Sequence, residues 1–260
     1  MLAKIVNIGK NSLKRHNFAV MAEKAVLRFK ERDYQKKSAK VLDWCREHAE
    51  SCEVFLKSLD AALYEETQQA AKEIEKHCRD KLSTIKLDLG GGGNYPLLYF
   101  LTRYLKPGNI IETGVAAGWS SQAMLTALKK NGNNGQLWSS DFPYFRYENP
   151  EELVGFVVDE ALKPDWHLYI EGDKFNLPKI VEGCGSVGLF HYDSDKSYNG
   201  REYAIKTVAP KLTDGATVIF DDIQDNFHFG DYVTNNKIPF KVFEFEGKYI
   251  GLTGGVLSHA

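Results

Sequence analysis

The chain has 260 residues, enough for one large hydrophobic core or for one domain with an appended segment. Its composition, 43% hydrophobic and 26% charged, is that of an ordinary globular protein. A secretory signal and a membrane-spanning run of about 18 apolar residues are both missing from the sequence, so we expect a cytoplasmic protein.

The net charge of −2 conceals a strongly basic first segment. Residues 1–40 carry eleven basic and three acidic side chains, a net charge of +8, which leaves −10 for the remainder. Such an arm can bind phosphate-rich partners, or it can bind the acidic part of this chain or of a second copy. Because aromatic residues do not alternate with the charges in a nucleic-acid-binding pattern, we favour the second interpretation and expect no nucleic-acid partner.

Residues 11–89 contain neither proline nor glycine, and over 41–82 apolar side chains recur every three or four residues. This spacing places them on one face of an α-helix, which predicts a helical segment ending near Leu82. The four glycines 90–93 then interrupt the pattern, so we place a domain boundary there, between a helical appendage (1–89) and a second domain (90–260). The apolar face of the appendage must be buried, either as a lid or in a homo-oligomer formed through these helices.

Predicted strands and helices alternate after the glycines. Asn94 is a candidate N-cap of a helix that ends at Pro107-Gly108. The predicted strands are 109–113, 135–141, 167–171, 187–192 and 216–220, with helices at 119–130, 174–181 and 198–208 and another starting at Asn149. Residues 240–245 and 248–252 flank Glu246-Gly247 and predict a terminal antiparallel hairpin. We therefore expect an α/β fold with a doubly wound, seven-stranded, mainly parallel sheet.

The strongest motif is the strand–turn–helix junction from Ile110 to Ser121, with Gly114 and Gly118 in the turn. Glycines let the backbone approach a ligand closely, and a helix starting at Trp119 would direct N–H groups and serine hydroxyls into the same crevice. The spacing of the two glycines differs from the G-x-G-x-x-G of nicotinamide-binding folds. A tight turn without a ligand is the alternative.

Carboxylates follow the next two predicted strands. Asp141 ends one strand, where an acid can accept both hydroxyls of a ribose. Asp173 follows the next strand, where it can accept from an adenine amino group. Taken singly, each is equally compatible with a surface turn. Their order along the chain after the glycine motif favours a nucleotide-like cofactor.

A second group of acids follows the later strands. Asp193 comes after one strand and Asp221-Asp222 after the next, so these side chains are expected to meet. Three carboxylates held together repel one another unless a proton or a cation intervenes, and such oxygen ligands suit Mg²⁺, Ca²⁺ or Mn²⁺. For Asp195 we favour a helix cap or a solvent-facing position, because adjacent strand residues alternate in direction.

Over roughly residues 95–255 the sequence resembles class I methyltransferases that use S-adenosylmethionine (SAM). The resemblance covers the glycine motif, the acids after the second and third strands, and the closing hairpin. It implies a SAM site formed by Glu112, Gly114 and Gly118, with Ser120 in the same turn, Asp141 at the ribose, Asp173 near the adenine and Phe142 over the adenine ring.

Within that class, Asp193 and Lys196 resemble the acid and lysine, three residues apart, of catechol and caffeoyl-coenzyme A O-methyltransferases. Those enzymes have Asp-Asn after the following strand, whereas Asp221-Asp222 resembles the macrocin and aminocoumarin sugar O-methyltransferases. The resemblance implies Mg²⁺ or another divalent cation held by Asp193, Asp221 and Asp222. The metal lowers the pKa of an acceptor hydroxyl, and Asp193 or Lys196 removes the proton.

The sequence thus predicts a SAM-dependent O-methyltransferase acting on a hydroxyl of a small molecule, sugar-like or a vicinal diol or catechol. His191 and His228 are further candidate bases, although a lone histidine is more often structural. The alternatives are a metal-independent methyltransferase, a nicotinamide-dependent oxidoreductase and a SAM-binding scaffold without activity. The glycine spacing argues against the oxidoreductase, and the crowded carboxylates argue against the scaffold.

Overall fold

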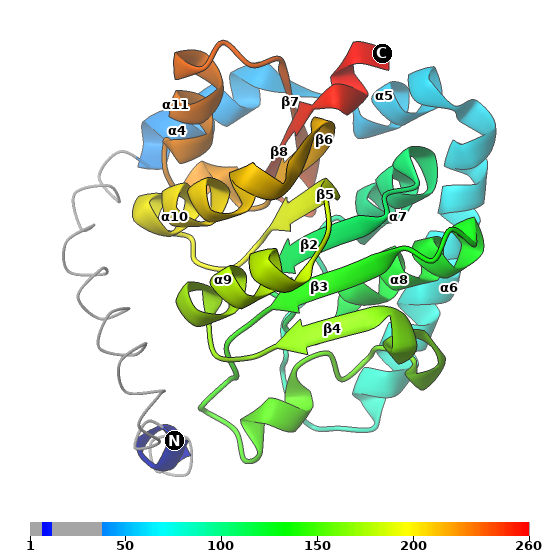
Figure 1. The fold of residues 1–260 in the computed structure, drawn as a ribbon, viewed down its shortest axis with the longest axis vertical. Coiled ribbons are helices and arrows are strands. Elements are labelled where there is room, and N and C mark those ends of the chain that lie inside the picture. The colour runs from blue at the N-terminus through cyan, green and yellow to red at the C-terminus, as the bar shows by residue number, and fades with distance from the viewer. Residues whose placement is uncertain (1–6, 12–37, 260) are drawn as a thin grey trace.

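The computed structural model describes residues 7–11 and 38–259, in which one mixed β-sheet is covered by helices on both faces (Figure 1). The strands are β1 (Ala49–Glu50), β2 (Asn109–Thr113), β3 (Gln136–Ser140), β4 (Trp166–Tyr169), β5 (Val187–Tyr192), β6 (Leu212–Phe220), β7 (Phe240–Phe245) and β8 (Lys248–Gly254). The α-helices are α4 (Ser38–His48), α5 (Cys52–Leu59), α6 (Ala61–Ser83), α7 (Tyr95–Leu105), α8 (Trp119–Asn131), α9 (Asp173–Gly183), α10 (Tyr198–Val208) and α11 (His228–Asn235). Short 3-10 helices lie at Pro150–Leu153, Glu160–Asp165, Ala209–Lys211, Ile223–Asp225 and Gly255–His259.

The order of the strands, β1-β7-β8-β6-β5-β2-β3-β4, confirms the doubly wound α/β sheet. β2 to β6 run parallel, whereas β8 is antiparallel to both β6 and β7. β2 lies between β5 and β3, so the order of the strands reverses there and opens a crevice at their carboxyl ends. The described chain has eight strands instead of seven because β1, only two residues long, pairs with β7.

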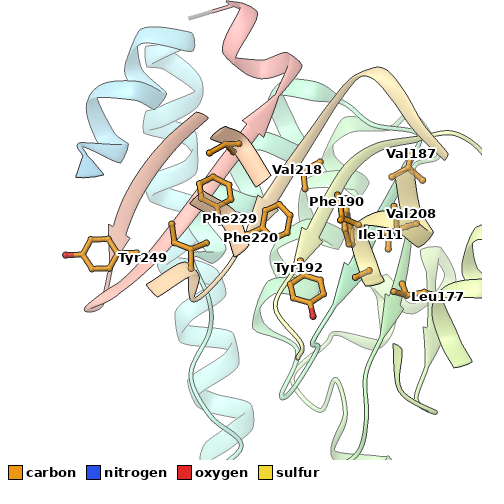
Figure 2. Packing of buried hydrophobic residues seen from close by; sticks show 14 of the residues in the cluster. Ile111, Leu177, Val187, Phe190, Tyr192, Val208, Val218, Phe220, Phe229 and Tyr249 are labelled. Atoms are coloured by element: carbon orange, nitrogen blue, oxygen red, sulfur yellow. The ribbon is translucent and has the colours of Figure 1, made fainter. Parts of the chain in front are cut away.

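Alternate residues of each central strand supply two separate cores. Ile111 and Phe190 contribute to the core beside α4, α9, α10 and α11 (Figure 2). Their neighbours Ile110 and Leu189 contribute to the opposite core beside α5, α7 and α8. Since adjacent strand residues point to opposite faces, a sheet covered on both faces needs continuous apolar strands. This requirement explains why the sequence signal for these strands was an apolar run.

The described part of the predicted appendage is mostly helical, with α6 ending at Ser83 and residues 84–89 outside any helix, and it packs against the rest of the chain. Glu66 of α6 accepts a hydrogen bond from Arg103 Nε of α7 at 2.8 Å. This bond is the main reason why the pKa of Glu66 falls to about 2. Phe55 and Leu56 of α5 are buried in the same core as α7 and α8. These contacts attach α5 and α6 firmly to the sheet.

A separate domain over residues 1–89 stays a prediction. Most of the basic arm, residues 1–6 and 12–37, lies outside the described residues. Across the described ranges, no helix combines the length and the apolar character needed to cross a membrane.

The prediction of a full helix starting at Asn149 is wrong. Asn149 has a left-handed φ of 45° and its side chain forms no capping hydrogen bond, and only the 3-10 helix Pro150–Leu153 follows. The amide of Gly155 instead donates to the carbonyl of Ala116 in the glycine motif at 2.9 Å. This long-range hydrogen bond competes with the helical pattern that the local sequence favours.

Helix α11 was missed by the sequence analysis. It contains Gly230, which weakens a helix, and its eight residues are too few for a clear period. Phe229 and Val233 are buried in the core, and the Phe229 ring lies 5.6 Å from that of Phe220. Tertiary packing therefore stabilises a helix that the local sequence does not.

Candidate functional site

The register of β2, β5 and β6 aligns their last residues, Thr113, Tyr192 and Phe220. The residues that follow these strands therefore start side by side, at the crevice where open α/β sheets bind ligands. A cavity of about 830 Å³ opens there. The predicted site residues that line it are Gly114, Asp141, Phe142, Asp173, Asp193, Lys196 and Asp222. The other predicted residues, Glu112, Gly118, Ser120 and Asp221, are buried and are not among its lining residues.

Asp141 offers both carboxylate oxygens at the wall of the cavity. Its Oδ2 accepts a hydrogen bond from the amide of Ala116 at 2.7 Å, and its Oδ1 accepts one from the amide of Phe142 at 2.6 Å. Each oxygen retains capacity for a second donor. Burial raises the pKa of Asp141 to about 7, although the two amide donors oppose this effect.

Asp173, the first residue of α9, links two strand ends while it lines the cavity. Its carboxylate accepts from Ser140 Oγ at 2.6 Å and from Ser194 Oγ. Phe142 also lines the cavity, and its ring packs against Phe145 with the ring centres 4.7 Å apart. The structure thus places Asp141, Phe142 and Asp173 together on one cavity, as the SAM interpretation requires.

Glu112 and Ser120 lie in contact with each other and not at the cavity. Glu112 is fully buried, and its Oε1 accepts from Ser120 Oγ at 2.5 Å. Its Oε2 accepts from Ser121 Oγ at 2.6 Å and from Ser139 Oγ at 2.7 Å. Three hydroxyl donors satisfy this buried carboxylate, which joins β2, β3 and the start of α8.

Both glycines of the motif are required by contacts within the protein. Gly114 has φ 82°, and a Cβ there would lie 2.2 Å from the carbonyl oxygen of Asp193. Gly118 has φ 101°, and a Cβ there would lie 2.9 Å from Cα of Gly155. The close approach that the sequence analysis assigned to a ligand is therefore made, at both positions, by the chain itself.

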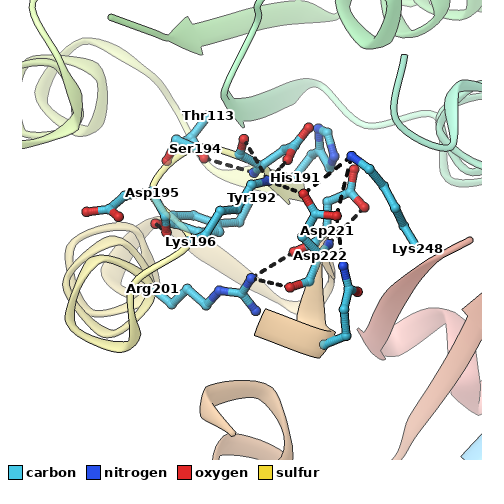
Figure 3. Close-up of polar contacts among 12 residues, drawn as sticks. Thr113, His191, Tyr192, Ser194, Asp195, Lys196, Arg201, Asp221, Asp222 and Lys248 are labelled. Atoms are coloured by element: carbon cyan, nitrogen blue, oxygen red, sulfur yellow. Dashed lines mark hydrogen bonds and ion pairs between the residues drawn. The ribbon is translucent and has the colours of Figure 1, made fainter. Parts of the chain in front are cut away.

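Lys196 bridges two of the predicted metal ligands (Figure 3). Its Nζ forms an ion pair with Asp193 Oδ1 and lies 2.8 Å from Asp222 Oδ2. A second lysine, Lys248, places its Nζ 3.4 Å from the other oxygen of Asp222, Oδ1. Burial opposes the charge on Lys196, but the carboxylates of Asp193 and Asp222 outweigh burial and raise its pKa. Lys196 is therefore a cation in this arrangement, whereas a general base must start without its proton.

Asp221 is 2% exposed and has one oxygen without a partner. Its Oδ1 accepts from the amide of Asp222 at 2.9 Å, whereas Oδ2 has no hydrogen bond to any described residue. Burial, followed by the nearby charge of Asp193, raises the pKa of Asp221 to about 6. A Cβ on Gly93 would lie only 2.7 Å from Oδ2. The glycine run thus approaches the acid cluster directly, which the sequence analysis missed.

His191 lies beside these acids. It is 1% exposed, and a ring nitrogen lies within 4.8 Å of carboxylate oxygens of Asp193 and Asp221. Its Nδ1 lies 3.9 Å from Glu112 Oε1. Burial disfavours the charged imidazolium, but the carboxylates of Glu112 and Asp193 outweigh burial and raise the pKa of His191.

His228 and Asp195 have other partners. His228 Nε2 lies 3.1 Å from Glu202 Oε2, and burial lowers the pKa of His228 to about 4. His228 is not among the residues that line the large cavity. Asp195 Oδ1 accepts from the amide of Ser197 at 3.0 Å, and its side chain points away from Asp221 (Figure 3). The residue that caps α10 is Ser197 and not Asp195, so a capping role for Asp195 is not confirmed.

Arg201 is a second residue that the sequence analysis missed. It is fully buried, and its Nη2 donates to the carbonyls of Asp221 at 3.0 Å and Asp222 at 2.7 Å. Asp222 has a left-handed φ of 52°, which is unfavourable for a non-glycine residue, so Arg201 stabilises a strained turn. A signal did exist, because Arg201 stands on the same helical face as the buried Ala204 and Val208.

The donors of this cluster fit a divalent cation. Asp193 and Asp221 offer carboxylate oxygens, His191 offers a ring nitrogen, and Asp221 Oδ2 is a buried atom without a partner among the described residues. The side chain of Asp222 lies in ion pairs with lysines. Its role as a metal ligand stays a prediction.

Part of the chain is similar to a known family, and the fold is similar to solved structures. The family model described as "Methyltransferase domain" matches residues 111–223. An O-methyltransferase from Bacillus cereus, solved with S-adenosylhomocysteine (SAH), is 13% identical with a TM-score of 0.54, and the match covers 70% of this chain and 90% of that chain. An O-methyltransferase from Streptomyces achromogenes involved in tomaymycin synthesis, solved with SAM, is 16% identical with a TM-score of 0.54 over 70% of this chain and 88% of that chain. An SAH-bound methyltransferase from Podospora anserina is 11% identical with a TM-score of 0.53 over 85% of this chain and 96% of that chain.

At these identities the likeness shows the fold alone. Among curated protein sequences, none matches this chain.

Proposed function

We propose that this chain transfers a methyl group from SAM to a hydroxyl oxygen of a small molecule, assisted by a divalent cation. The match of residues 111–223 to the methyltransferase family model supports this proposal. One observation carries the proposal. The same cavity is lined by Asp141 and Asp173 of the expected cofactor site and by Asp193 and Lys196 of the expected chemical site. A donor and an acceptor bound there lie close together, so that the protein accelerates transfer chiefly by positioning them.

The cofactor role of Asp141 is supported by the lone pairs that its oxygens retain. The amides of Ala116 and Phe142 hold the carboxylate in place, and each oxygen can accept one ribose hydroxyl as well. Phe142 supplies an apolar face for the adenine ring, and Asp173 an acceptor for its amino group. Glu112, Gly118 and Ser120 shape the turn from behind the cavity wall.

In the proposed chemical step, the residues Asp193 and Lys196 handle the proton of the acceptor. A divalent cation held by Asp193 and Asp221, with Asp222 as the further ligand that the resemblance implies, would supply Lewis-acid stabilisation of the acceptor alkoxide. Asp193 accepts the proton directly, or it accepts the proton of its ion-pair partner Lys196 while Lys196 takes up the proton of the acceptor. Arg201 keeps the turn at Asp221 and Asp222 in the geometry that this arrangement needs.

The remaining lining residues support a hydroxyl-bearing acceptor. Arg146, Asn199 and Lys248 add polar groups to the cavity, while Tyr144 and Phe145 add aromatic surface. A sugar-like ring or a vicinal diol or catechol matches this combination of flat apolar surface and hydrogen-bonding groups.

A metal-independent methyltransferase is the second candidate, and one observation favours it. Lys196 and Lys248 already neutralise part of the charge on Asp193 and Asp222. In that case Asp193 acts as the base without a cation.

Asp141→Asn is expected to weaken SAM binding at least about tenfold. Losing a charged hydrogen-bond partner costs about 1.5–3 kcal/mol, and about 1.4 kcal/mol corresponds to a factor of ten. Titration calorimetry with SAM measures the effect, and Asp214→Asn, at an exposed position of β6, is the matched control. If both variants bind SAM like the unmodified protein, Asp141 does not hold the ribose.

We further propose that the chain forms a homo-oligomer in which the basic arm of one copy binds the acidic part of another. Raising the salt concentration from about 0.1 M to about 1 M shortens the Debye length from about 10 Å to about 3 Å, so the mass measured by light scattering should fall to that of a monomer. Lys36→Glu with Lys37→Glu should have the same effect at low salt, whereas Lys57→Glu on α5 should not. A constant mass under all these conditions would show that the arm does not mediate association.

A further inference from the structure

Three ligating groups converge where β5 and β6 end. His191 precedes Asp193 by two residues, and alternate residues of a strand point to the same face. Asp221 follows the neighbouring strand β6. One ring nitrogen of His191 and one carboxylate oxygen of each aspartate lie within 4.8 Å of one another. With bonds of about 2.1 Å to a first-row ion, adjacent ligand atoms are about 3.0 Å apart and opposite ones about 4.2 Å apart, so the three side chains must move closer together to bind one ion.

Gly93 has no side chain and therefore leaves a space beside these groups. A Cβ on Gly93 would lie 2.7 Å from Asp221 Oδ2 and 3.8 Å from Asp193 Oδ2. Gly93 is not among the residues with positive φ, so its backbone conformation does not require glycine. Asp221 Oδ2 is buried without a partner in the described chain, although buried polar atoms are normally paired. A cation in this space supplies the missing partner.

Asp222 is held on the other side of the cluster. Its carboxylate lies 2.8 Å from Lys196 Nζ and 3.4 Å from Lys248 Nζ, and Gln224 Nε2 donates to it at 3.1 Å. These contacts occupy both carboxylate oxygens of Asp222, whereas Lys196 pairs with Oδ1 alone of Asp193. The imidazole of His191 is therefore left as the third ligand.

We propose that His191, Asp193 and Asp221 hold the divalent cation beside Gly93, and that the imidazole makes the site prefer Mn²⁺ or Co²⁺ to Mg²⁺. Carboxylates alone suit Mg²⁺, whereas an imidazole favours ions later in the first transition series. Glu112 Oε1 lies 3.9 Å from Nδ1 of His191, beyond hydrogen-bond distance, and a small shift would bring it into the place of the outer carboxylate that commonly accompanies a metal-bound histidine. The role of this cation in methyl transfer rests on the proposed function, but its binding does not.

The test uses the full chain and Mn²⁺ alone, without SAM. Electron paramagnetic resonance follows free Mn²⁺ during a titration, and pulsed measurements on the bound ion detect nitrogen hyperfine coupling. His191→Phe is expected to weaken Mn²⁺ binding at least about tenfold and to remove the nitrogen coupling, while Mg²⁺ affinity changes less. Gly93→Ala is expected to weaken the binding of both Mn²⁺ and Mg²⁺, because the added methyl group occupies the site. His228→Phe, at another buried histidine, is the matched control and should bind Mn²⁺ normally.

Each outcome decides the inference separately from the proposed function. Mn²⁺ binding that shows no nitrogen coupling, survives His191→Phe and is lost in Asp222→Ala overturns the assignment of His191 and leaves a cation held by acids. Absence of Mn²⁺ and Co²⁺ binding to the unmodified protein overturns the site itself. SAM calorimetry on every variant reports whether it is folded and whether the cofactor part of the proposed function holds. If His191→Phe does not fold, two other results decide whether His191 binds the cation. These are Mn²⁺ binding to Gly93→Ala and the nitrogen coupling of the unmodified protein.

Discussion

Removal of divalent cations is expected to lower methyl transfer by about 100-fold or more while SAM affinity changes by less than about twofold. Without a cation, the acceptor hydroxyl keeps its ordinary pKa, and the charges of Asp193 and Asp221 repel one another across the buried cluster. The expected SAM contacts are made by Asp141 and Asp173, which are separate side chains. Conversion of SAM to SAH with sugar and catechol acceptors, before and after EDTA, measures the loss, and added Mn²⁺ or Mg²⁺ should restore the activity.

Asp221→Asn provides the matching variant. It removes the buried charge but keeps an oxygen ligand, so it should require a higher cation concentration for the same turnover. Asp214→Asn on the surface should behave like the unmodified protein. Full activity in EDTA, with no cation bound to the protein, would instead support the metal-independent methyltransferase with Asp193 as base.

Gly114→Ala is expected to destabilise the protein by about 2–5 kcal/mol and to remove activity. Alanine in a left-handed conformation costs about 1–2 kcal/mol, and overpacking a tight site costs about 1–3 kcal/mol more. The clash is severe because the atom 2.2 Å from the new Cβ is the backbone carbonyl oxygen of Asp193, which cannot rotate away as a side chain can. Relief of the clash must displace Asp193, the residue proposed to bind the cation and to accept the proton of the acceptor.

Chemical denaturation measures this loss of stability. Gly215→Ala is the matched control, since a Cβ there meets no atom within 4 Å and φ is not positive. We expect Gly215→Ala to change the free energy of unfolding by less than about 0.5 kcal/mol. Equal stability of the two variants would contradict this prediction. It would mean that the backbone around Gly114 shifts enough to accommodate the new methyl group.

The elements that were predicted correctly depend on neighbouring residues, and those that were missed depend on contacts with distant segments. The bounds of β2, β5, β7 and α10 were predicted to the residue, because apolar runs and helical periods are properties of neighbouring residues. The Asn94 cap was also predicted, and its side chain accepts from the amide of Leu97. The prediction failed at Asn149 and missed α11, where hydrogen bonds or packing to distant segments outweigh the local pattern.

The residues of the site divide in the same way. Their order after successive parallel strands predicted that Asp193 and Asp221 would meet, because parallel strands bring their carboxyl ends to one edge. The sequence could not determine which oxygen of each side chain faces the cavity. Glu112 is enclosed by serines and Asp222 by lysines, and both outcomes depend on side-chain rotamers set by residues distant in the chain.

The sequence by itself therefore determined the fold class, the topology of the parallel strands and the edge of the sheet where the site lies. That information lies in hydrophobic periodicity and in turn motifs, which involve only neighbouring residues. Only the tertiary structure decided that Gly93 lies against Asp221, that Arg201 supports the Asp222 turn, and that His191 joins the acids. Gly93 and Asp221 belong to segments far apart in the chain, and only the folding of the sheet and its helices around one core sets their separation.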